Sequence, residues 1–211
     1  MNEEHSKLPE IPWPQQGDTV FSSDGDWRMN ACLYFHRSDW NAYATSYKDA
    51  ADALVERVAA NRHQLDTMVY PITFLYRHYI ELRLKEVIQE GTKLLGTTPP
   101  KKLLKEHLIV PLWDHCRNLL QQIWPKGPQC DLDAVANCIH QFAAVDPIAQ
   151  VFRYPTDQKG NPHLSQFTQV NVSNLAEVIS RIAGLLDGAS SGISAYLDEK
   201  EEMDSSYNPE A

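Results

Sequence analysis

The sequence has no run of about 18 consecutive apolar residues, which is the length that a helix needs to cross a bilayer. Its first residues are acidic and contain no apolar core of a secretory signal. The 211 residues, 43% of them hydrophobic, suffice for one domain but not for two of ordinary size. We therefore expect one soluble, cytoplasmic domain with tails and no contact with membranes.

Cysteine is scarce, with four residues and no pair in the close C-x-x-C spacing that marks structural zinc sites. The sequence also lacks the Gly-rich loops that bind phosphate in nucleotide-binding enzymes and the nucleophile elbow of hydrolases. Reduced and mostly buried thiols are the default in an intracellular chain. We therefore expect no metal and no cofactor.

A strong positive charge is absent as well, since the formal net charge is -9. The acidic residues gather at the two ends: residues 1–30 hold six acids against two bases, and residues 186–211 hold seven against one. Residues 77–117 carry eight bases and five acids. This is a weak basic bias and not the dense Lys/Arg stripe of a protein that binds duplex DNA by charge. Contact with a nucleic-acid backbone would require the fold to gather these bases on one face.

Helical periodicity dominates the chain from residue 38 onward. Pro9, Pro12 and Pro14 exclude a helix from the first residues. Residues 1–37 are therefore predicted to form an irregular arm, with the aromatic-rich run from Trp27 to Trp40 packing over a core. The five predicted helices cover about residues 38–66, 71–95 and 101–123, then run from Asp131 or Asp133 to about Val145, and from Asn171 or Ser173 to about Leu197.

The segment 71–95 has apolar residues around most of its circumference, which is typical of a helix buried on several sides. We expect it to be the central element of an all-α, up-and-down bundle of about five helices over residues 38–197. Residues 198–211 are too polar to order themselves and are predicted to be a disordered acidic tail.

Three charged residues, Arg77, Glu81 and Lys85, lie four residues apart and form one line along the predicted central helix. His78 lies on the adjacent face. Such charges are costly on an apolar helix unless they pair with one another or face a polar cleft. Two interpretations stay open: an ion-pair ladder that fixes the helix register, and a ligand-facing stripe in which Arg77 and His78 approach a phosphate. His107 is expected to face Arg77 or Glu81 across the bundle.

Three segments carry a resemblance to a known family. Residues 70–85 read YPITFLYRHYIELRLK and resemble the second helix of HEPN-like proteins, an aromatic-rich helix with E-x-x-L-K. Residues 107–113 are similar to the H-x-L-x-x-L helix that follows it in that superfamily. The FRYPTD run at residues 152–157 resembles a turn that precedes the last helix in some members. The resemblance covers about residues 39–197.

The resemblance implies a compact helical bundle that forms a homodimer. Many members of the family are metal-independent ribonucleases of toxin–antitoxin, abortive-infection or CRISPR-associated systems, and others bind nucleotides, RNA or partner proteins without catalysis. RNA can be cut without a metal when a His moves protons and an Arg stabilises the charge that develops on the phosphate. We therefore expect RNA, a nucleotide or a co-encoded protein as the partner, with catalysis not established.

The sequence departs from the family's ribonuclease motif, in which an Arg precedes a His by four to six residues near the last helix. Arg57 and His63 have that spacing but lie near the start of the bundle, and we interpret them as surface charge.

The alternative catalytic pair is Arg153 and His163, ten residues apart in the loop before the last predicted helix. Tyr154 and Asp157 are further candidates for ligand binding in the same loop. Arg153 could instead cap a helix end or pair with Asp157. A third possibility is a purely structural subunit whose acidic tails contact a basic partner.

Overall fold

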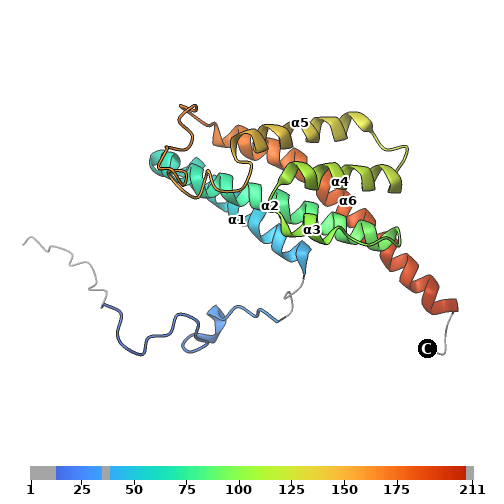
Figure 1. The fold of residues 1–211 in the computed structure, drawn as a ribbon. Coiled ribbons are helices and arrows are strands. Elements are labelled where there is room, and N and C mark those ends of the chain that lie inside the picture. Colours follow the sequence, from blue (N-terminus) through green and yellow to red (C-terminus); the bar gives the residue numbers. More distant parts are fainter. Residues whose placement is uncertain (1–12, 35–38, 208–211) are drawn as a thin grey trace, which may run out of the picture. The chain divides into compact units, whose positions relative to one another are not determined.

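The computed structural model describes residues 13–34 and 39–207 (Figure 1). The chain divides into two compact units, Met1–Arg37 and Ser38–Ala211. The described part of the first unit contains a single short 3-10 turn, η1 (Trp27–Met29), and buries none of its side chains. Residues 13–34 therefore form an irregular arm. The packing of its aromatic side chains over a core stays a prediction.

The second unit is a bundle of packed helices, which confirms the predicted all-α class. Within residues 39–207 no strand is present, and six α-helices follow one another. They are α1 (Trp40–Ala60), α2 (Leu65–Leu94), α3 (Lys101–Lys105), α4 (Ile109–Ile123), α5 (Gln129–Val145) and α6 (Val172–Tyr207). None of these helices combines the length and the apolar character needed to span a membrane.

The central helix is α2, as its apolar circumference predicted. It packs against α1, α4 and α6 (Figure 1). Every residue from 79 to 88 is buried. Ten consecutive buried residues take in all sides of a helix, so the charged residues among them are withdrawn from water together with the apolar ones. Each of these charges therefore needs a partner inside the bundle.

The first predicted helix is too long, because α1 ends at Ala60 and not near residue 66. Asn61 leaves the helical conformation, and its side chain accepts a hydrogen bond from the backbone N–H of His63, at 3.2 Å, in the next short turn. Arg57 and His63 consequently lie in separate elements, and both are exposed. After this break α2 begins at Leu65, earlier than predicted, and contains Pro71 at the cost of one helical hydrogen bond.

The third predicted helix is two helices, α3 and α4, separated by residues 106–108. Glu106 and Leu108 both have extended backbone conformations. Pro111 does not bend a helix here: it lies in the first turn of α4, where a backbone N–H has no helical acceptor in any case. His107 therefore lies in the connecting segment and not within a helix.

The prediction of disorder for residues 198–207 is wrong, since α6 continues to Tyr207 and its last turns project beyond its neighbours (Figure 1). Glu, Lys and Met have high helix propensity, and extending an existing helix avoids the cost of nucleation. Lys93 of α2 also pairs with Glu201 at 3.0 Å. The remaining part of the predicted tail, residues 208–211, lies outside the described residues.

Candidate functional site

The buried guanidinium of Arg77 joins three segments of the bundle. Its Nη1 donates to Glu81 Oε2 at 3.0 Å, one turn along α2. Its Nε donates to the carbonyl oxygen of Asp146 at 3.1 Å, and its Nη2 donates to that of His107 at 2.6 Å. Arg77 has no exposed surface. It therefore ties the loop after α5 and the segment before α4 to the middle of the central helix.

Glu81 is the acidic centre of the same cluster. Its Oε1 accepts a hydrogen bond from Lys85 Nζ at 2.9 Å and lies 2.8 Å from His107 Nδ1. Burial alone would raise the pKa of Glu81, but the hydrogen bonds from Lys85 and His107 bring it below its usual value. The prediction that His107 faces Glu81 is confirmed, with an imidazole 66% exposed above a carboxylate 2% exposed.

The contacts within the charged stripe favour one of its two interpretations. The spacing of four residues does bring Arg77 and Lys85 into contact with Glu81 between them, and all three are buried. Their charges are used within the protein, so the geometry favours the ion-pair ladder. Of the whole cluster, only the His107 ring reaches solvent to a large extent.

Asp146 completes the cluster and was missed in the sequence. It is fully buried, and its Oδ1 accepts the backbone N–H groups of Gln150 at 2.7 Å and Val151 at 3.2 Å. Its Oδ2 lies 3.9 Å from Arg77 Nε. The sequence contains one indication of this role: Asp146 stands before Pro147 at the end of a helical pattern, a position typical of a side chain that caps a turn. Asp146 thus fixes the turn that leads to Arg153.

The loop between α5 and α6 folds back on itself. The backbone N–H of His163 donates to the carbonyl oxygen of Pro155 at 2.9 Å. Asp157 does not form the expected pair with Arg153: it accepts hydrogen bonds from the side chain and backbone of Asn161, both at 2.9 Å, which lower its pKa. The loop therefore holds residue 163 beside the segment that carries Arg153.

Arg153 is exposed on this loop and lies over aromatic rings. Its guanidinium carbon is 5.6 Å from the ring centre of Phe74 and 5.5 Å from that of Tyr154, which is 54% exposed. Its Nε donates to the carbonyl oxygen of Ala149. No carboxylate in the described parts of the chain lies within ion-pair distance of it. Its charge is therefore open to a ligand, unlike that of Arg77.

His78 belongs to the same neighbourhood through Phe74. The two rings are stacked with centres 5.8 Å apart, and Tyr47 of α1 meets the imidazole edge-on at 4.4 Å. Burial is the main cause that lowers the pKa of His78. Phe74 therefore contacts both His78 and Arg153 and links two of the predicted site residues.

A second polar cluster, between α2 and α6, was not predicted from the sequence. Arg83 pairs with Glu86 and lies 2.8 Å from Asp187 of α6, and Ser190 Oγ donates to Glu86 at 2.6 Å. Tyr79 donates its hydroxyl to Asp187 at 2.8 Å. Burial would lower the pKa of Arg83, but the two carboxylates raise it. This cluster joins α2 to α6 and leaves no cation free, so it acts as part of the scaffold.

In the described residues, no group of three or more His, Cys, Asp or Glu side chains is arranged to hold a metal ion. A comparison of the chain with protein-family models, with curated proteins and with solved structures found no match.

Proposed function

We propose that the chain is a HEPN-like protein that binds single-stranded RNA through Phe74, Arg153 and Tyr154, which we call the arginine–aromatic surface. The observation that carries the proposal is the position of the Arg153 guanidinium, over two rings and without a carboxylate partner in the described residues. A guanidinium binds phosphate through two hydrogen bonds at once, and exposed rings stack on unpaired bases.

The rigidity of the loop supports the same proposal. Arg77 holds the main chain of Asp146, and the side chain of Asp146 caps the turn that follows. Arg153 is therefore positioned before a ligand arrives, which lowers the ordering cost of binding. Single strands are favoured over duplexes because the surface offers few cations and the net charge of the chain is -9.

The proposal is tested by the fluorescence anisotropy of a labelled RNA of about 12 nucleotides titrated with the protein in EDTA. Arg153→Ala is expected to weaken binding about tenfold, because a stacking or charged contact contributes about 1–3 kcal/mol. The matched control is Arg181→Ala, an exposed arginine on α6 outside this loop. Equal affinities of the wild type and Arg153→Ala would contradict the proposal.

A second candidate function is metal-independent cleavage of RNA by Arg153 and His163. It is favoured by one observation: the hydrogen bond from the N–H of His163 to Pro155 brings residue 163 next to the segment that carries Arg153. Cleavage in EDTA, followed on a denaturing gel and abolished by His163→Ala without loss of helical circular dichroism, is the expected result. RNA that stays intact at high protein concentration excludes this candidate and leaves binding alone.

The expected homodimer and the place in toxin–antitoxin or phage-defence systems belong to this proposal, because the same resemblance implies them. Their support within the chain is the all-α bundle.

A further inference from the structure

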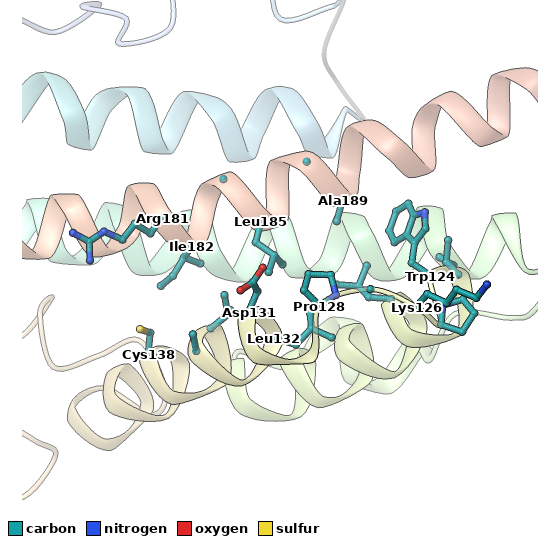
Figure 2. A pocket seen from close by; sticks show the side chains of 18 of the residues that line it. Trp124, Lys126, Pro128, Asp131, Leu132, Cys138, Arg181, Ile182, Leu185 and Ala189 are labelled. Carbon is teal, nitrogen blue, oxygen red and sulfur yellow. The ribbon is translucent and has the colours of Figure 1, made fainter.

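A groove of about 1130 Å³ runs between α5 and α6, with the end of α4 closing one side (Figure 2). It is separate from the arginine–aromatic surface, since none of the three residues of that surface lines it. Apolar side chains from all three helices cover most of its walls. Among them are Leu120, Leu132, Val135, Ile182, Leu185 and Ala189.

Two glycines on α6 open the groove down to the helix backbone. Gly184 and Gly188 lie one turn apart, and a Cβ placed on either would meet nothing within 4 Å. One turn further, a Cβ on Gly192 would lie 3.0 Å from the Trp124 ring, so the indole closes that end. A second helix can therefore approach the α6 backbone closely along this stretch.

The dimensions of the groove suit a helix better than a small molecule. Its lining on α6 extends from Val178 to Ala189, which corresponds to about 16 Å or about three helical turns. Its volume exceeds the roughly 300–1,000 Å³ that is usual for small-molecule pockets. An amphipathic helix buries its apolar face in an open groove of this kind through residues three and four positions apart.

The charged residues of the groove indicate the chemistry of the occupant. Figure 2 shows Arg181 and Lys126 toward opposite ends, with Asp131 between them. Asp131 lies in the first turn of α5, where the helix dipole already stabilises a negative charge. Arg181 pairs with Glu177 at 3.2 Å, and both side chains are largely exposed. The two cationic ends therefore complement acidic side chains on a partner.

We propose that this groove binds an amphipathic helix of another protein, about three turns long, with an acidic side chain near each end of its apolar face. The binding is independent of RNA, so failure of one proposal leaves the other intact.

The proposal is tested by selecting a displayed library of random peptides of about 18 residues on the full-length chain. The selected peptides are expected to share apolar residues at helical spacing and acidic residues at both ends of that face. Gly188→Leu, which fills the groove, should weaken their binding at least tenfold in fluorescence anisotropy. The matched control is Ser191→Leu on the exposed face of α6, which does not line the groove and should bind like the wild type.

Charge reversal tests the electrostatic part of the proposal separately, because a change in packing alone would not reverse the preference for acidic peptides. Lys126→Glu combined with Arg181→Glu should weaken binding of the acidic peptides severalfold at low salt and strengthen binding of versions with Lys in place of the terminal acids. Three results overturn the proposal: selected peptides without helical periodicity, equal binding by wild type and Gly188→Leu, or sedimentation showing a dimer that Gly188→Leu dissociates. The last would assign the groove to a second copy of this chain.

Discussion

The Arg77 guanidinium donates a hydrogen bond to the main-chain oxygen of His107, thirty residues further along the chain, at 2.6 Å. This bond crosses from the central helix to the segment between α3 and α4, and it leaves the His107 ring directed at Glu81. Arg77, which the sequence suggested as a phosphate ligand, is thus buried and connects three segments of the bundle. Arg153 is the exposed cation of the arginine–aromatic surface.

Replacing Arg77 by Met is expected to lower the free energy of unfolding by about 3–5 kcal/mol, because it leaves Glu81 short of one buried partner and frees two carbonyl groups. Urea unfolding followed by circular dichroism measures the change. Arg181→Met is the control, since an exposed pair contributes under about 1 kcal/mol. A loss below about 1 kcal/mol in Arg77→Met would show that the cluster does not hold the bundle together.

The pH dependence of stability should report His78. Burial lowers its folded pKa below the ordinary value of 6.5, with Glu81 opposing and Arg77 adding to the shift. As the pH falls, the unfolded chain therefore takes up this proton before the folded protein does. The free energy of unfolding consequently decreases as the pH drops through about 6.5, and above that pH His78 causes no change in it. The difference between the urea midpoints at about pH 7.5 and about pH 5.5 should shrink in His78→Gln. Burial also lowers the pKa of His115, so a part of the difference should remain. The exposed His63→Gln should keep the wild-type difference, and a His78→Gln variant that keeps it too would refute the assignment.

Alanine substitutions at two neighbouring glycines of α6 should differ in their effect on stability. Gly188→Ala adds a methyl group in open space and improves helix propensity, so it should stabilise the protein by about 0.5–1 kcal/mol. Gly192→Ala places its methyl group 3.0 Å from the Trp124 ring and should bring no gain. Thermal unfolding of both variants compares the two sites. Equal stabilisation would mean that Trp124 does not occupy the place next to Gly192.

The salt dependence of RNA affinity should identify Arg153 as a phosphate contact. Removing one such contact reduces the slope of log affinity against log salt by about 0.7 for a single strand. Arg153→Ala should show this smaller slope, whereas Tyr154→Ala should lose affinity with the slope unchanged, because stacking releases no counterions. Anisotropy titrations at several salt concentrations give both quantities. An unchanged slope in Arg153→Ala would rule out a phosphate contact by this residue.

The features that the sequence predicted correctly are those set by local periodicity. The apolar circumference of residues 71–95 identified the central helix, and the spacing of Arg77, Glu81 and Lys85 predicted their mutual pairing as one of two outcomes. Both follow from the geometry of one helix, which needs no knowledge of the rest of the fold.

The features that the sequence did not predict depend on packing between distant segments. Asp187 meets Arg83, and Asp146 meets Arg77, only after the helices are assembled. The contact of Phe74 with Arg153 is of the same kind. The helix beyond residue 197 was missed for another reason: overall polarity indicated disorder, while the propensities of the individual residues favour continuing the helix.

A nuclear magnetic resonance titration of the isotope-labelled protein with the same single-stranded RNA shows whether Arg153 and Tyr154 bind RNA. We expect the Arg153 Nε–Hε signal and the Tyr154 backbone amide signal to shift most, while the signals of the buried Arg77 stay in place. RNA that saturates the protein without moving the Arg153 signal would contradict this expectation.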